Sequence, residues 1–126
     1  MTIQHQLDRL RDEAPGCDLV AFGDLSSGLI LNWAARSACQ REVLDLLMQN
    51  ATASLALLAR VDLPGGVDLA DMGTSVIHFT ERGAEVFVRL SAASDEVICV
   101  ACPLDADLER LLGSTIALAD QIEGNG

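Results

Sequence analysis

Residues 75–90 have the sequence SVIHFTERGAEVFVRL, in which two runs of β-branched and aromatic residues flank a short polar turn. The runs are Ser75–Thr80 and Ala84–Leu90, and the turn is Glu81–Gly83. Runs of this length and composition favour β-strands, and a three-residue connection that ends in glycine favours a hairpin. We therefore predict an antiparallel pair of strands here.

A second hairpin is predicted upstream. The apolar runs CDLVAFG (Cys17–Gly23) and LILNWA (Leu29–Ala34) are separated by the turn-forming segment Asp24–Gly28, where a glycine suits a positive φ. Downstream, EVICVAC (Glu96–Cys102) is apolar at almost every position. A strand of this kind is typical of the centre of a sheet that is covered on both faces.

Three helices complete the pattern. Apolar residues recur at helical spacing near residues 2–13 and again near residues 105–122. A long helix is expected over Cys39–Val61, with acidic residues near its start and an arginine near its end, as the helix dipole favours. Asp105 is the predicted N-cap of the last helix, and Gly124 is expected to close it.

The predicted order of elements is α-β-β-α-β-β-β-α, in a single domain over residues 1–126. Two hairpins interrupted by a helix give a five-stranded, mainly antiparallel sheet in an α/β (α+β) fold. Because the strands alternate poorly between apolar and polar residues, both faces of the sheet need cover. We expect the long helix on one face and the two terminal helices on the other.

The long helix has more apolar surface than one sheet face can bury. No charged residue occurs between Asp45 and Arg60, and apolar residues point in nearly every direction. The strand Ser75–Thr80 follows a loop and is short of the lysines and prolines that protect sheet edges. We expect these two elements to form a dimer or partner interface. The predicted interface residues are Val43, Leu46, Leu47, Asn50, Ala53, Leu57, Ser75, Val76, Ile77, His78 and Phe79.

The alternative for each of these two elements is cover from within the same chain. Another element could bury the second apolar face of the helix. The acidic loop between Val61 and Thr74 could shield the edge of the strand.

The composition excludes several kinds of partner. The net charge is −11, with 19 acidic and 8 basic residues, which argues against nucleic acid and anionic membranes. Every basic residue is arginine, so there is no lysine for a P-loop or a Schiff base. The longest uncharged stretch, Leu46–Ala59, is too short and too polar to span a bilayer, which needs ~20 apolar residues. The N-terminus lacks the pattern of a secretory signal, so we expect a cytoplasmic protein without membrane insertion.

No residues have the spacing of a catalytic, cofactor or metal site. Cys99 and Cys102 form a CxxC sequence, but residues three apart on a strand face opposite sides, so the two sulfur atoms cannot converge. We expect all four cysteines to be reduced thiols. His5 and His78 lack partners at ligand or triad spacing. The sequence therefore predicts no catalytic residue, no cofactor and no metal, and the protein is not expected to be an enzyme.

The two hairpins and the final strand–helix unit resemble the roadblock (dynein light-chain-like) family. The matching segments are LVAFGDLSSGLILNW, SVIHFTERGAEVFVRL and VICVACPLDADLERLLGSTIALADQI. Members of that family pair through the third strand, here Ser75–Thr80, so that one sheet continues across two subunits. Their long helices, here Cys39–Val61, then lie side by side. Bacterial relatives often accompany a small Ras-like GTPase, so the resemblance implies a homodimeric scaffold or GTPase regulator.

Two other classes of function stay open. Profilin-like and longin-type domains share much of this architecture, and a small-molecule sensor of the profilin-like or PAS-like class predicts an internal pocket between sheet and helix. An enzyme predicts a convergent set of reactive groups. Arg36 and Arg82 are expected to be exposed, where an arginine could act on a GTPase in trans, but nothing in the sequence singles either out and surface solubility is the better explanation.

Overall fold

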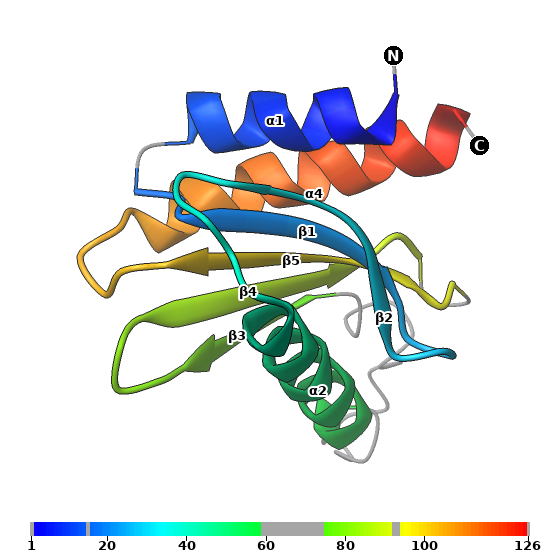
Figure 1. Cartoon of the computed structure of the whole chain (residues 1–126). Helices are drawn as coiled ribbons and strands as arrows, with labels where there is room; N and C mark the ends of the chain where they lie inside the picture. The colour runs from blue at the N-terminus through cyan, green and yellow to red at the C-terminus, as the bar shows by residue number, and fades with distance from the viewer. Residues whose placement is uncertain (1, 15, 59–74, 92–93, 126) are drawn as a thin grey trace, which may run out of the picture.

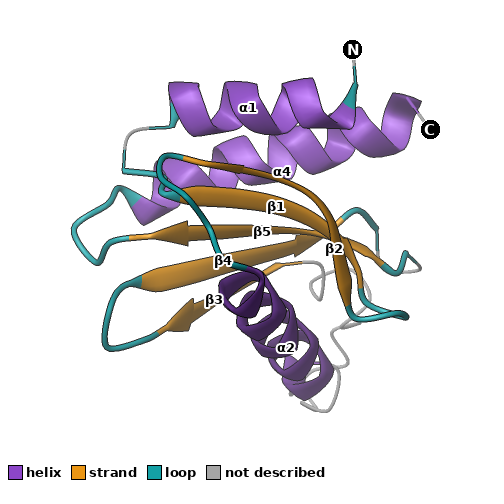
Figure 2. Cartoon of the chain, in the orientation of Figure 1, coloured by secondary structure: helices purple, strands orange, loops and turns teal. Residues whose placement is uncertain are grey.

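The computed structural model describes the chain except for residues 1, 15, 59–74, 92–93 and 126. In this part of the chain, helices and strands follow one another in the predicted order (Figures 1 and 2). The elements are α1 (Ile3–Glu13), β1 (Leu19–Asp24), β2 (Leu29–Ala35), α2 (Arg41–Leu58), β3 (Ser75–Phe79), β4 (Ala84–Arg89), β5 (Glu96–Cys102) and α4 (Leu108–Asn125).

The strands form one antiparallel sheet with the order β2-β1-β5-β4-β3. β5 lies at its centre, as its apolar sequence predicted, and residues 97–100 are fully buried. The hairpin of β3 and β4 closes with Phe79 paired to Ala84. In the first hairpin, Gly28 has a φ of 72°, a left-handed conformation that glycine adopts without strain.

Side chains alternate between two apolar cores, one on each face of the sheet. α1 and α4 cover one face and α2 crosses the other, which confirms the predicted layers (Figure 1). Along β5, Ile98 and Val100 face α1 and α4, whereas Val97 and Cys99 face α2. Because Cys102 belongs to the core under α1 and α4, the two cysteines of the CxxC sequence point to opposite faces, as predicted.

α2 packs on the sheet through one stripe of its surface. The members of this stripe are at most 5% exposed and are Leu44, Leu47, Met48, Ala51 and Leu55. Their spacing of three or four residues places them on a single helix face. Burial of each larger apolar side chain contributes about 1.5–3 kcal/mol, so this stripe holds α2 against the sheet.

The ends of the last helix differ from the prediction. α4 begins at Leu108 because its N-cap is Asp107 and not Asp105. The Oδ1 atom of Asp107 accepts a hydrogen bond from the backbone N–H of Arg110 at 3.2 Å, which satisfies a donor in the first turn. Gly124 does not close the helix, since α4 continues to Asn125.

Smaller differences occur at the other elements. α1 begins at Ile3, because Thr2 acts as its N-cap and accepts a hydrogen bond from the His5 N–H at 3.2 Å. α2 begins at Arg41 instead of residue 39, and the predicted residues 59–61 lie outside the described part of the chain. β1 begins at Leu19, two residues later than predicted. None of the described helices is both long enough and apolar enough to cross a bilayer.

Candidate protein-interaction surface

The two edges of the sheet differ in how their backbone is covered. At the β2 edge, α1 lies over the strand. Gln4 Nε2 donates to the carbonyl oxygen of Trp33 at 2.8 Å, and Arg11 Nη1 donates to that of Ala35 at 3.4 Å. Side chains of α1 therefore occupy acceptors that a neighbouring strand would otherwise use.

The β3 edge has no such cover among the residues that the structure describes. Thr80 and Gly83 form a hydrogen-bonded pair, because the N–H of Thr80 donates to the carbonyl of Gly83 at 2.8 Å. Hydrogen-bonded and non-hydrogen-bonded pairs alternate along antiparallel strands. Phe79, Ile77 and Ser75 therefore belong to non-hydrogen-bonded pairs, and their backbone N–H and C=O groups point away from β4. No hydrogen bond from another described residue reaches these groups. The predicted edge is thus an edge in this part of the chain.

The predicted interface residues on β3 divide between the two faces of the sheet. Val76 packs on the core under α2, and His78 lies on the same face. Ile77 packs on the opposite core, and Phe79 shares that face with 61% of its surface exposed. An interface that used all of β3 would therefore run along the edge of the sheet instead of over one face.

Three of the predicted interface residues on α2 are exposed apolar residues in the structure. Val43 and Leu46 are 50% and 58% exposed, and Ala53 is also exposed. Leu47 is only 2% exposed and belongs to the core. Leu57 lies within α2, but its side chain is outside the described part of the structure.

The carboxylate of Glu85 joins α2, β3 and β4 at this surface. Its Oε1 atom accepts a hydrogen bond from Asn50 Nδ2 at 3.0 Å and lies 2.9 Å from Nδ1 of His78. Sequence reasoning selected Asn50 and His78 but missed Glu85. The register of the hairpin pairs His78 with Glu85 and was a usable signal, whereas nothing in the sequence relates Glu85 to a residue 35 positions away.

A groove of about 530 Å³ opens between the first turns of α2 and the end of the sheet. One wall contains Val43, Leu46, Leu47 and Asn50 from α2, and the other contains residues 80–85 of the β3–β4 turn. Leu19 and Ala101 line its floor near the ends of β1 and β5, and the exposed Asp18 lines its edge. Four predicted interface residues of α2 therefore share one hollow.

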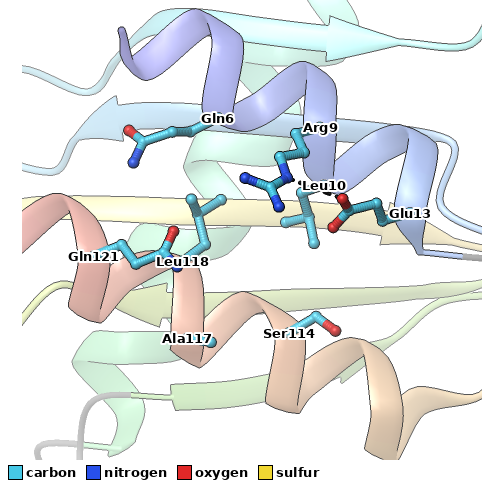
Figure 3. A pocket seen from close by; sticks show the side chains of 8 residues that line it. All are labelled: Gln6, Arg9, Leu10, Glu13, Ser114, Ala117, Leu118 and Gln121. Carbon is cyan, nitrogen blue, oxygen red and sulfur yellow. Dashed lines mark hydrogen bonds and ion pairs between the residues drawn. The ribbon is translucent and has the colours of Figure 1, made fainter. Parts of the chain in front are cut away.

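A smaller hollow of about 190 Å³ lies between α1 and α4 (Figure 3). The residues that line it are Gln6, Arg9, Leu10, Glu13, Ser114, Ala117, Leu118 and Gln121. Arg9 Nε and Glu13 Oε1 form an exposed ion pair at 2.9 Å along α1. The hollow is on the face of the sheet opposite α2 and shares no residue with the groove.

The four cysteines are free thiols, and three of them are buried in the protein. Burial raises the pKa of Cys17 to about 11, and it also raises the pKa of Cys99 and Cys102. The pKa of Cys39 is raised for the same reason. Because the thiolate is the reactive form, these groups are poor nucleophiles near neutral pH.

Of the two arginines considered for a partner contact, Arg36 is already occupied within the chain. Its guanidinium donates to the carbonyl oxygens of Cys17, Arg11 and Ala14. Arg36 is exposed, as predicted, but these bonds hold its guanidinium against the end of α1. Arg82 is exposed in the β3–β4 turn and lines the groove.

The polar side chains of the turn between β1 and β2 bond to one another. Asp24 accepts hydrogen bonds from Ser26 N–H at 3.0 Å and from Ser26 Oγ at 2.8 Å, which lowers the pKa of Asp24 and fixes the turn. Within the described residues, no three His, Cys, Asp or Glu side chains converge on a point where a metal ion could be held.

No protein-family model and no curated protein matches the chain. Solved structures match it over its whole length. The Roadblock/LC7 domain from Streptomyces avermitilis superposes with a TM-score of 0.76 at 12% identity, covering 99% of this chain and 98% of that one. MglB from Myxococcus xanthus gives 0.71 at 16% identity, with 98% and 93% coverage.

A profilin from Schizosaccharomyces pombe gives a TM-score of 0.61 at 17% identity, covering 99% of each chain. At these identities the similarity establishes the fold alone. The chain has the fold of roadblock domains, which profilins share, and the predicted resemblance is confirmed at that level.

Proposed function

We propose that the protein is a non-enzymatic, cytoplasmic homodimer that binds other proteins and that its principal partner is a small Ras-like GTPase. The observation that carries the proposal is the contrast between the two sheet edges. α1 side chains bond to the β2 edge, whereas no described residue bonds to the outer side of β3. An open strand edge is a template for a second strand.

Antiparallel pairing of β3 with its own copy joins two sheets into one. The two-fold axis then stands perpendicular to the sheet, so both α2 helices lie on the same face, next to the junction. Exposed Ala53 and half-buried Asn50 lie on the part of α2 that would approach the partner helix. Such a contact covers apolar surface that one subunit leaves exposed.

The polar group formed by Asn50, His78 and Glu85 lies beside the proposed junction. Its hydrogen bonds are made within one subunit, so pairing need not leave a buried polar atom without a partner. A polar cluster inside an otherwise apolar contact also favours one register of association. This arrangement supports a specific pairing over unspecific edge-to-edge aggregation.

A matched pair of alanines on α2 tests the dimer. Ala53 and Ala56 are both exposed, but Ala53 lies about 60° around the helix from Asn50, whereas Ala56 lies about 120° from it and further from the proposed contact. We expect Ala53→Glu to raise the dissociation constant of the dimer at least tenfold, equivalent to about 1.4 kcal/mol, because it places two like charges near the axis. Ala56→Glu should raise it by less. Sedimentation equilibrium measures both, and a monomeric wild-type protein at micromolar concentration would remove the proposal.

The identity of the partner needs a separate measurement. The roadblock resemblance implies a GTPase, and the net charge of −11 favours a partner with a basic surface through electrostatic steering. Surface plasmon resonance with Ras-like GTPases from the same genome, loaded with GDP or a GTP analogue, tests this step. Absence of binding in both nucleotide states would reject the GTPase and leave the dimer intact.

The alternative function is a small-molecule sensor of the profilin-like or PAS-like class. The observation in its favour is the hollow between α1 and α4, where the polar side chains of Gln6 and Gln121 lie beside the apolar Leu118; this hollow is between two helices and not between sheet and helix. Native mass spectrometry of the purified protein distinguishes the two functions. A retained small molecule would support the sensor.

A further inference from the structure

The groove under α2 is separate from the strand edge that the proposed dimer uses. None of residues 75–79 lines it, and it begins at the β3–β4 turn, where the edge ends. Asn50 lines the groove and also adjoins the proposed contact between the two α2 helices, whereas the part of the groove beside the β3–β4 turn stays open in the paired form. The groove's volume of about 530 Å³ is in the range of sites that hold a few side chains.

The groove has an apolar wall and an acidic rim. Val43 and Leu46 are half exposed or more along the wall, next to the buried Leu47. Large apolar side chains exposed to this extent at the lip of a hollow are typical of contact surfaces. A neutral apolar ligand would contact this wall but would place no positive charge against the acidic rim.

The rim carries three carboxylates and one cation. Asp18 and Glu81 are exposed and form no ion pair with another described residue. Glu85 is half-buried, and its two hydrogen bonds both use Oε1, so Oε2 keeps its acceptor capacity within the described structure. Among the described residues, Arg82 is the only basic one that lines the groove. The excess of negative charge calls for a cationic group in any ligand that also contacts the wall.

We infer that the groove binds a segment of a protein partner in which an arginine adjoins an apolar side chain. The guanidinium sits on the rim formed by Asp18, Glu81 and Glu85, where its planar fork can bond a carboxylate through two N–H groups. The apolar neighbour rests on Val43 and Leu46. The inference rests on the proposed binding function and names the chemistry of the partner at this surface.

A short probe tests the groove directly. The dipeptide N-acetyl-leucyl-arginine amide is titrated into ¹⁵N-labelled protein and followed by two-dimensional NMR, with the isosteric citrulline analogue as the neutral control. We expect saturable shifts at the backbone amides of Val43, Leu46 and residues 81–85. We expect binding of the citrulline peptide to be at least fivefold weaker, because it lacks the charge.

Matched variants test whether the rim and the wall both contribute to peptide binding. Glu81→Gln should weaken binding of the arginine peptide at least threefold, whereas Glu109→Gln, the same change at an exposed position on α4, should have no effect. Leu46→Ser should weaken binding by a similar factor, and Leu31→Ser, at a similarly exposed leucine on β2, should leave binding unchanged. Equal binding of the citrulline peptide, or shifts spread over other surfaces, would overturn the inference.

Two further readouts separate this inference from the dimer. If the same amides shift on dilution of the protein alone, a second copy occupies the groove and the inference is wrong. Sedimentation on the same samples reports the oligomeric state. A monomer that binds the arginine peptide would support the proposed binding groove and reject the homodimer. A dimer that does not bind the peptide would support the homodimer and reject the proposed binding groove.

Discussion

At Gly23 the sheet and α2 are in such close contact that a larger residue cannot fit without movement. A Cβ atom there would lie 2.1 Å from Met48 Cε and 2.9 Å from the carbonyl oxygen of Leu29. The methionine can change rotamer, but the backbone oxygen cannot easily move. This glycine is therefore fixed by packing, because its φ is not in the left-handed region.

We expect Gly23→Ala to lower the free energy of unfolding by about 1–3 kcal/mol, the usual cost of overpacking. Gly113 is the matched control, because it lies inside α4 with open space around its Cα. Gly113→Ala should raise the free energy of unfolding by about 0.5–1 kcal/mol through helix propensity. Urea denaturation measures both, and equal effects at the two glycines would contradict the packing argument.

The thiol of Cys17 makes stability depend on pH in the alkaline range. Burial raises its pKa from 9.0 to about 11, so between these values the folded state binds more protons than the unfolded state. The stabilisation is complete below pH 9 and is lost as the pH rises toward 11. Two pKa units correspond to about 2.7 kcal/mol.

We expect wild-type protein to lose more free energy of unfolding between pH 8 and pH 10.5 than Cys17→Ala does. Chemical denaturation of both proteins at the two pH values provides the comparison. Taking the difference between proteins cancels the contribution of Cys99 and Cys102, which titrate in the same direction. A parallel loss in both proteins would show that Cys17 ionises as it does in the unfolded chain.

At the scale of elements, one side chain fixes how α1 sits on the sheet. Arg36 follows β2 and donates to the carbonyl oxygens of Arg11 at 2.9 Å and Ala14 at 3.5 Å, at the end of α1. It also bonds the carbonyl of Cys17 before β1. A cation at a helix C-terminus is favoured by the dipole and satisfies carbonyls that have no partner in the helix.

We expect Arg36→Ala to lower the free energy of unfolding by about 1–2 kcal/mol and to speed amide exchange in α1 and β2. Arg110→Ala removes the same charge from an exposed position on α4 and should do neither. Chemical denaturation measures the free energy of unfolding, and hydrogen–deuterium exchange measures the exchange of the amides in α1 and β2. Unchanged exchange in α1 would mean that the helix is held by its apolar contacts alone.

The elements and their layers could be predicted because each depends on local pattern. Continuous apolar sequence placed β5 at the centre, and strand alternation sent Cys99 and Cys102 to opposite faces. The start of α4 was misplaced because Asp105 and Asp107 are both good N-caps, and only the hydrogen bond to Arg110 distinguishes them.

The contacts of the candidate surface were less accessible to sequence reasoning. The bond between Asn50 and Glu85 depends on how α2 crosses the sheet, which no local pattern encodes. The exposure of Arg36 was predictable because a charged residue in a connector is usually solvated, but its bonds to the carbonyls of Arg11 and Cys17 were not. The loop before β3, considered as a shield for the edge, lies outside the described residues, so that expectation stays a prediction.

At the scale of the whole molecule, the difference between the two sheet edges limits how far the proposed assembly can grow. A chain with one open edge pairs once and stops, whereas a chain with two open edges adds subunits without end. β2 would be a hazard if uncovered, because Leu29, Leu31 and Trp33 are all at least 39% exposed along it. The hydrogen bonds from Gln4 and Arg11 to β2 would then make α1 the element that prevents a further subunit from pairing with that strand.

We therefore expect the double variant Gln4→Ala with Arg11→Ala to form species larger than a dimer as protein concentration rises, measured by sedimentation velocity. Arg9→Ala, on the exposed side of the same helix, should remain dimeric. Phe79→Pro removes an outward N–H from β3, so adding it to the double variant should cut the larger species back to pairs joined through β2. If the double variant keeps the size of the wild-type protein, the side chains of α1 do not guard that edge, and the packing of the helix alone must do so.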